Sequence, residues 1–89
     1  MRAVITVLGE DKIGIIAKTS SVLYEANVNI LDISQTIMSD VFTMIMLVDI
    51  SAMKLSFEEL SEKLSAVGEE LGVAVKIQHE SIFNSMHRI

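Results

Sequence analysis

The residues of this sequence that are best suited to hold a small molecule lie in two short segments, one around Asp11 and one around Asn29. Glu10, Asp11 and Lys12 are consecutive charged residues, and Gly14 follows them where the pattern predicts the first turn of a helix. Glycine costs a helix about 0.5–1 kcal/mol relative to alanine, so Gly14 needs a reason. One reason is the close approach of a ligand to the free N–H groups of a helix start, where the helix dipole favours a carboxylate.

Asn29 adds a donor and an acceptor at the start of a strand that we expect to lie beside this loop. Together these groups suit a small zwitterion, in a cradle at the first strand–helix junction that we expect a dimer partner to complete. The N–H groups after Gly14 would bind its carboxylate, and Asp11 with the carbonyl group of Asn29 would bind its ammonium group. The alternative is that Gly14 only relieves packing between the helix and a strand, and the residues alone favour neither explanation.

Other reactive residues are weaker candidates. Glu10 and Asp11 are a candidate acid–base pair, but no nucleophile or oxyanion-binding arginine accompanies them, and a solvated turn with Asp11 as the helix N-cap is the better explanation. His79 and His87 are the two histidines, and in a small domain histidines lie at the surface more often than they bind metal. We therefore predict no catalytic residue, no metal site, no cofactor and no enzyme activity.

Composition restricts the class of protein. The chain has 89 residues, enough for one small domain, and its 51% hydrophobic and 4% aromatic content predicts an aliphatic core. A net charge of −5 argues against direct binding to nucleic acid, and the absence of cysteine excludes disulfides and thiolate chemistry. No apolar run approaches the roughly 18–20 residues that span a bilayer, so we expect a cytoplasmic domain with no membrane partner.

Hydrophobic periodicity predicts strands and helices in regular alternation. The strands are expected at residues 2–8, 28–38, 41–50 and 73–78, and the helices at 13–26 and 56–71. In the first helix, the apolar or small residues at 13, 16, 17, 20, 23 and 24 form the stripe expected to face the core. The second helix has a capping box of Ser56 and Glu59 at its start and Gly72 at its end.

This order of elements predicts an α+β fold, the ferredoxin-like βαββαβ sandwich, with a four-stranded antiparallel sheet and both helices on one face. We assign residues 1–81 to this single domain. Residues 82–89 form an apolar tail that is expected to dock on the domain or on a partner chain. Ile82, Phe83, Met86 and Ile89 share one helical stripe of this tail.

The strand at residues 41–50 is apolar on both faces. Phe42, Met44, Met46 and Val48 alternate along it with Val41, Ile45 and Leu47. Such a strand needs cover on both sides, and helices on one side of the sheet leave the other side bare. We therefore predict a homodimer, packed either face to face or edge to edge. The alternative is that the tail alone covers the second face.

The ferredoxin-like fold serves unrelated functions, so it does not identify one. A metal chaperone of this topology would carry two thiols in the first loop, and this chain has no cysteine. An acylphosphatase-like enzyme would need an arginine in that loop, whereas the only arginines are Arg2 and Arg88. An RNA-binding module would need aromatic residues on the sheet, and only Phe42 falls clearly in a predicted strand.

The first strand, D-K-I-G-I at residues 11–15 and A-N-V-N-I at residues 26–30 resemble the ACT domain, a regulatory βαββαβ module that senses small molecules, most often amino acids. The resemblance covers about residues 4–78. The sequence I-S-Q-T at residues 33–36 and the apolar tail are most similar to stand-alone bacterial ACT proteins related to the glycine cleavage system transcriptional repressor. The resemblance implies ligand contacts at Asp11, Gly14, Ile15, Asn29 and Ile30. Many ligand-binding members have a proline where this chain has Ile13.

Two functional hypotheses follow. The first is a non-enzymatic regulatory domain that senses an amino acid and acts as a homodimer. The second is a structural protein–protein interaction module that binds no ligand. A ligand-dependent shift in melting temperature would separate them.

Overall fold

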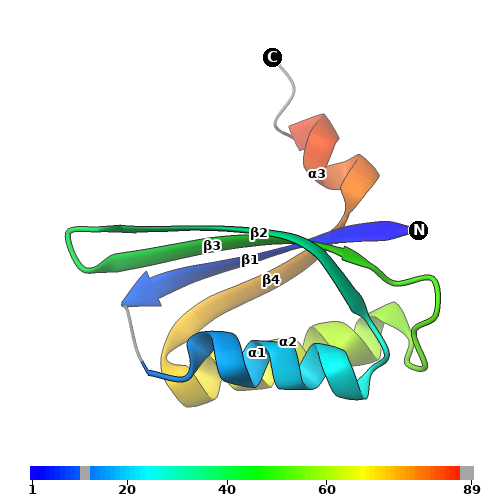
Figure 1. The fold of residues 1–89 in the computed structure, drawn as a ribbon, viewed down its shortest axis with the longest axis horizontal. Helices are drawn as coiled ribbons and strands as arrows, with labels where there is room; N and C mark the ends of the chain where they lie inside the picture. The colour runs from blue at the N-terminus through cyan, green and yellow to red at the C-terminus, as the bar shows by residue number, and fades with distance from the viewer. Residues whose placement is uncertain (11–12, 87–89) are drawn as a thin grey trace.

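The computed structural model describes residues 1–10 and 13–86, and within these ranges the predicted order of strands and helices is confirmed (Figure 1). The elements are β1 (Arg2–Glu10), α1 (Ile15–Glu25), β2 (Asn29–Met38), β3 (Val41–Asp49), α2 (Phe57–Leu71), β4 (Val73–His79) and α3 (Glu80–Met86). Within the described residues no helix is long and apolar enough to cross a membrane.

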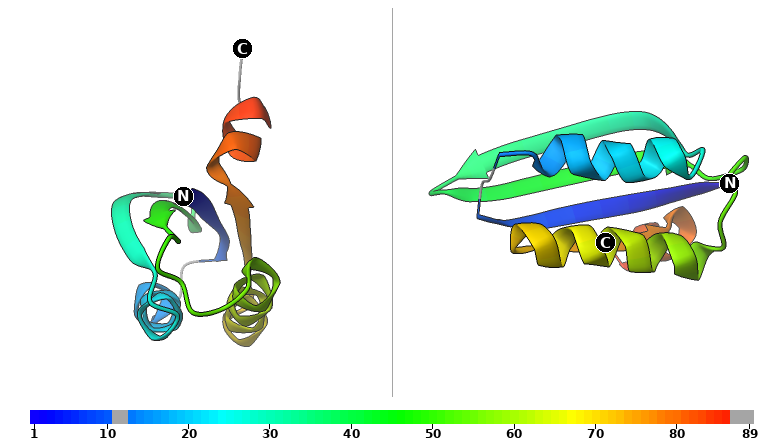
Figure 2. Two further views of the ribbon diagram at one scale, coloured as in Figure 1. Left: turned by 90° about the vertical axis from the view of Figure 1, so that its right-hand side faces the viewer. Right: turned by 90° about the horizontal axis from the view of Figure 1, so that it is seen from below.

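The four strands form one antiparallel sheet in the order β2-β3-β1-β4. Figure 2 shows α1 and α2 side by side beneath one face of this sheet, while α3 rises from the other face at the β4 side. We call the face without α1 and α2 the open face. The ferredoxin-like prediction is therefore confirmed, with β2 and β4 as the two edge strands.

The second helix begins and ends as its sequence predicts. Ser56 Oγ accepts from the N–H of Glu59 at 3.1 Å, and the Glu59 carboxylate accepts from the N–H of Ser56 at 3.2 Å. This reciprocal pair satisfies two of the N–H groups that a helix start leaves open. Gly72 ends the helix with a left-handed φ of 71°, which glycine adopts at little cost.

The first helix differs from its prediction. It begins at Ile15 with Gly14 as the N-cap, so the expectation of an N-cap at Asp11 is wrong, and Asp11 itself lies outside the described residues. Its buried residues are Ile15, Thr19 and Leu23, whereas Ile13 is fully exposed. The predicted stripe was wrong because both sides of the helix carry apolar residues, and the polar Thr19 interrupts the side that is buried.

The two faces of β3 have the exposures that its sequence pattern predicts. Phe42, Met44, Met46 and Val48 are buried beneath α1 and α2. On the open face, Val41 is 45% exposed and Ile45 is 39% exposed. Next to β3, residues 31–38 of the edge strand β2 are exposed throughout.

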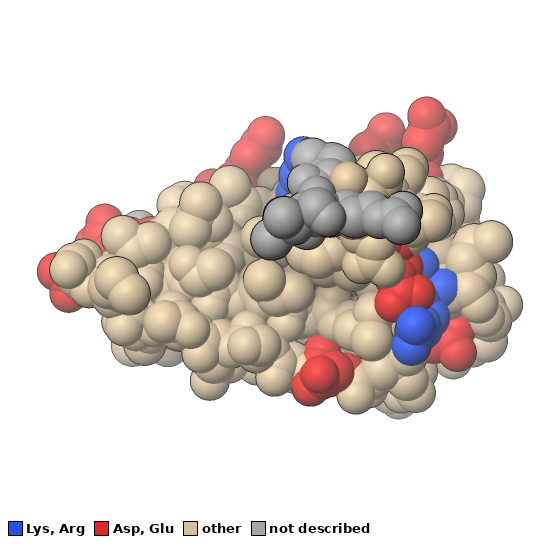
Figure 3. All heavy atoms as spheres, turned by 90° about the horizontal axis from the view of Figure 1, so that it is seen from above, with Lys and Arg blue, Asp and Glu red and all other residues tan. Residues whose placement is uncertain are grey.

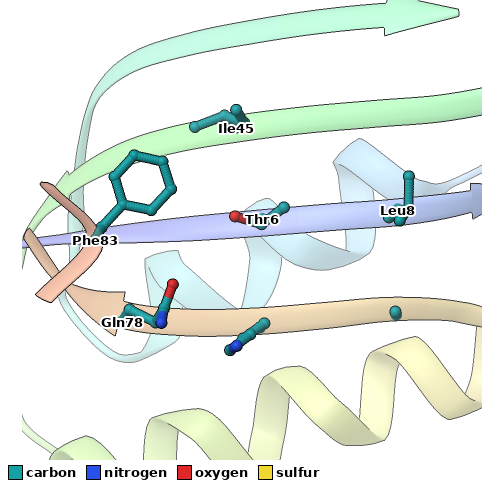
Figure 4. Close-up of a pocket in the computed structure, with 7 residues that line it drawn as sticks. Thr6, Leu8, Ile45, Gln78 and Phe83 are labelled. Atoms are coloured by element: carbon teal, nitrogen blue, oxygen red, sulfur yellow. The ribbon is translucent and has the colours of Figure 1, made fainter. Parts of the chain in front are cut away.

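Helix α3 includes residues 82–86 of the tail and contacts β1 and β4. Arg2 and Glu80 fix its base, with the Arg2 Nε donating to Glu80 Oε1 at 3.0 Å and Nη2 lying 2.8 Å from Oε2. Above this pair, the ring of Phe83 lies over the sheet near Thr6 and Ile45 (Figure 4). Within the described residues, α3 contacts β1 and β4, and Ile45 on β3 remains 39% exposed. His87 and Ile89 lie outside the described residues.

Candidate ligand site

Gly14 gives α1 an open N-terminus. Its φ is 91° and its ψ is 0°, and no side chain caps the helix at this residue. The first intrahelical hydrogen bond of α1 runs from Lys18 N to Gly14 O at 2.9 Å, so the N–H groups of the preceding turn have no partner within the helix. These N–H groups can bind an anion, and the helix dipole favours one there.

The reason for glycine at position 14 is its backbone conformation. Among the described residues, apart from its chain neighbours and the backbone of its own helix, a Cβ atom added to Gly14 would meet no atom within 4 Å, so these residues give no sign that glycine relieves packing between helix and strand. Its left-handed φ is what disfavours any other residue. Among the described residues, no atom beyond the chain neighbours and the backbone of the same helix lies within 4 Å of the position that a Cβ atom would take at residue 14, as the approach of a ligand there requires.

Ile15 and Ile30 lie next to Gly14 and Asn29 in sequence, but their side chains belong to the interior. Ile15 is only 2% exposed, and Ile30 is half-buried and packs against the same core. Both residues therefore hold the backbone of the candidate site in place, and neither presents its whole side chain to a ligand.

Asn29 lies at the opposite end of the sheet from Gly14. It pairs with Asp49, which in turn pairs with Arg2 at the start of β1, whereas Glu10 at the end of β1 pairs with Val41. The eight steps along β1 correspond to about 26 Å. The expectation that Asn29 lies beside the β1–α1 loop of its own chain is therefore wrong, because α1 carries the chain back along the sheet before β2 begins (Figure 2).

Each end has its own hollow. At the Gly14 end, a hollow of about 630 Å³ is lined by Gly9, Glu10, Ser39, Asp40 and Val41. At the other end, a hollow of about 270 Å³ is lined by Tyr24, Asn27, Val28, Asn29 and Ala52. The first hollow has two carboxylate side chains, which suit an ammonium group, and the second has the amide of Asn29.

Asp40 and Ser39 were not predicted as site residues. They form the turn between β2 and β3, where both have a positive φ, and the antiparallel register of β1 with β3 places this turn beside the end of β1. The sequence showed Ser39 and Asp40 only as a polar break. The ferredoxin-like fold pairs the first strand with the third. This pairing would have predicted that Ser39 and Asp40 lie beside the end of the first strand.

The Asn29 end is fixed by hydrogen bonds. The Asn27 side-chain amide donates to the carbonyl oxygen of Ala52 at 2.9 Å. Asp49 accepts from Ser51 N at 2.9 Å, and hydrogen bonds from the Ser51 side chain and backbone lower the pKa of Asp49 from its ordinary value. A stable carboxylate therefore lies opposite Asn29 in the sheet register.

The histidines and acidic residues form no metal site in the part of the chain that the structure describes. His79 stacks on Phe57 with a distance of 4.2 Å between ring centroids and an angle of 16° between the rings. This contact gives His79 a packing role between the end of β4 and the start of α2. His87 lies outside the described residues.

Comparison with known proteins identifies the family. Residues 2–78 match the model of the ACT domain. The chain is 57% identical to a UPF0237 protein of Clostridium acetobutylicum over the whole of both chains. Its fold is similar to that of an ACT domain protein from Streptococcus pneumoniae, with a TM-score of 0.80, 43% identity and 93% of each chain covered.

A more distant structure shows the fold alone. It is a putative glycine cleavage system transcriptional repressor, which is 23% identical with a TM-score of 0.71, and the match covers 86% of this chain and 43% of that one. The family model and the two closer relatives cover most or all of this chain. The chain therefore belongs to the ACT domain family.

Proposed function

We propose that this protein is a regulatory domain that binds a free amino acid and acts as a homodimer, without catalytic activity. ACT domains are generally regulatory domains that sense small molecules. The observation that carries the finer proposal is the placement of Gly14 and Asn29. An open helix start and an amide suited to a zwitterion lie at opposite ends of one chain, so a second chain is needed to bring them together.

Side-by-side pairing of two copies would complete the site. A two-fold axis perpendicular to the sheet, beside the edge strand β2, would set β2 and α1 of one copy antiparallel to those of the other. This arrangement brings the Gly14 end of each copy to the Asn29 end of its partner. It gives two equivalent sites per dimer and covers the exposed edge of β2.

Each residue then has a defined role. The N–H groups after Gly14 bind the amino acid carboxylate, and the amide of Asn29 from the other copy binds the zwitterion from the opposite side. Asp11, together with Glu10 and Asp40, supplies negative charge for the ammonium group. Ile15 and Ile30 support the backbone at the two ends, because their side chains pack inward.

The proposed function also implies a cellular location and a class of binding partner. Free amino acids are abundant in the cytoplasm, which is where we place the protein. The net charge of −5 and the clustered carboxylates at the Gly14 end favour neither nucleic acid nor an anionic membrane surface as a partner. The signal would instead pass to another protein through the dimer.

The second candidate function is a protein interaction module with no ligand, and the exposed apolar residues of the open face favour it. Titration calorimetry of the wild-type protein with each standard amino acid separates the two. Heat with one or a few amino acids, lost in Gly14→Val, supports sensing. No heat with any of them leaves the interaction module as the function.

A further inference from the structure

The open face of the sheet is unusual for this chain because its centre is uncharged. The register places these residues on it: Thr6, Leu8, Ser34, Thr36, Met38, Val41, Thr43, Ile45, Leu47 and Ala74. None carries a charge, although 21% of the chain is charged. Figure 3 views this face from above and shows a largely uncharged surface between the β2–β3 turn and α3.

The charged residues of this face lie at its rim. Arg2 and Asp49 are at one end of the strands and Glu10 is at the other. Lys76 lies on β4 and Asp32 on β2, so the two sides of the rim have opposite charge. Within the described residues, neither Lys76 nor Asp32 forms an ion pair.

The same face has a hollow beside α3. Its volume is about 410 Å³, and it is lined by Thr6, Leu8, Ile45, Ala74, Lys76, Gln78 and Phe83. Figure 4 shows Phe83 at one end of this hollow, with Ile45, Thr6 and Leu8 along the strands beneath it. Most of its wall is apolar, and Ile82, next to Phe83 on α3, is 51% exposed. An apolar side chain from another molecule fits this hollow better than water does.

We propose that a second copy of this chain packs on the open face, with the two-fold axis parallel to the strands. An uncharged contact surface is what allows two chains of net charge −5 to approach each other closely. An axis in this direction sets the β2 side of one copy over the β4 side of the other. The Lys76 side then lies against the Asp32 side of the partner, so each lateral side of the rim meets the opposite charge, whereas each end of the strands lies over the same end of the partner.

The shape of the face selects the same axis. The helix α3 rises from the β4 side, where it contacts β1 and β4, and the β2 side has no such wall (Figure 2). With the axis parallel to the strands, α3 of each copy stands beside the bare β2 side of its partner. An axis across the strands would instead place the β4 sides over each other, with both α3 helices and both Lys76 ammonium groups on the same side.

This contact is separate from the side-by-side pairing of the proposed function. It uses the centre of the open face, which includes neither Gly14 nor Asn29, whereas the side-by-side pairing uses the edge of β2. It therefore predicts self-association without any amino acid, and four chains where both contacts form. Failure of one contact leaves the other in place, so each is tested independently.

Sedimentation equilibrium of the full chain without amino acid tests the contact, using two matched variants. Ile45 on the open face is 39% exposed, and Ile33 on the other face of the edge strand β2 is 41% exposed. Both are strand isoleucines with similar exposure, so lysine at either position should be similarly tolerated by the fold. Circular dichroism of both variants verifies that they are folded.

We expect Ile45→Lys to weaken the open-face association by at least about tenfold, because two buried ammonium groups face each other across the axis. We expect Ile33→Lys to keep that association at its wild-type strength and to form dimers rather than larger assemblies. A wild-type protein that sediments only as the 9.8 kDa monomer overturns the proposal. A folded Ile45→Lys that associates as the wild type does overturns it as well.

Discussion

The two faces of the sheet are formed by the same strands, yet they meet different surroundings. On the covered face, Ile5, Met44 and Met46 are completely buried by α1 and α2. On the open face, Leu8 is 49% exposed and Ile45 is 39% exposed, although both are as apolar as the residues behind them. The comparison shows that the covered face holds the fold together, whereas apolar residues of the same strands stay exposed on the open face of the single chain.

The largest effect that this comparison predicts is a difference in the free energy of unfolding between two variants at neighbouring residues of β3. Met46→Ala opens a cavity in the core and should lower the free energy of unfolding by about 2–5 kcal/mol. Ile45→Ala, one residue away on the open face, should cost only about 1 kcal/mol in the monomer. Urea unfolding at low protein concentration measures both, and equal losses would show that the faces do not differ in this way.

The next effect concerns binding. Asn29→Ala removes a hydrogen bond to a charged ligand and should weaken amino acid binding by roughly ten- to a hundredfold, which corresponds to about 1.5–3 kcal/mol. Asp11→Ala should act similarly. Because Asn29 is exposed, the melting temperature should hardly change. Asn84→Ala, at an exposed residue of α3, is the matched control. If Asn84→Ala weakens binding as much as Asn29→Ala, the site is misplaced.

Alanine substitutions at Gly68 and Gly14 should lower the stability by different amounts, because one glycine is closely packed and the other is not. A Cβ atom on Gly68 would lie 2.6 Å from the carbonyl oxygen of Val73, so Gly68→Ala must push α2 away from β4 and should cost about 1–3 kcal/mol. Among the described residues beyond its chain neighbours and the backbone of its own helix, a Cβ atom on Gly14 meets no atom, so Gly14→Ala should cost only about 1 kcal/mol, for its left-handed φ. Thermal unfolding compares the two, and a larger loss for Gly14→Ala would contradict the open space at the helix start.

The smallest effect is a pH dependence at the Asn29 end. Hydrogen bonds from Ser51 lower the pKa of Asp49 below the ordinary value of 3.8, so the folded state favours the carboxylate. The resulting stability is fully present above that value and disappears as the pH falls through the lowered pKa. The stability difference between wild type and Asp49→Asn should therefore shrink on acidification. A difference that stays constant down to pH values well below 3.8 would show that these hydrogen bonds do not favour the charged form.

Much of the fold was predictable from local patterns. The cap of α2 at Ser56 and Glu59, its end at Gly72 and the alternation in β3 each depend on residues close together in sequence. The buried side of α1 was not predictable in the same way. Thr19 is polar yet completely buried, and Ile13 is apolar yet fully exposed, and because both sides of the helix carry apolar residues the local pattern does not indicate which side packs on the sheet.

In the candidate site, residues that are close in sequence lie far apart in the fold. Gly14 and Asn29 are separated by a single helix, and this suggested one cradle at the first strand–helix junction, completed by the dimer partner. The helix instead places them at opposite ends of the sheet, and Asp40 comes to the Gly14 end through strand pairing. A site that depends on such pairing, or on a second chain, cannot be read from neighbouring residues.

A mixing experiment tests most directly the central claim that each amino acid site is shared between two chains. Gly14→Val and Asn29→Ala each break both sites of their own homodimer, so neither variant alone should bind tightly. After the two are mixed and exchanged, half of the dimers contain one of each, and every mixed dimer holds one intact site. Calorimetric titration should then recover about one quarter of the wild-type sites at wild-type affinity. No recovery on mixing would contradict the shared site and place Gly14 and Asn29 in separate functions.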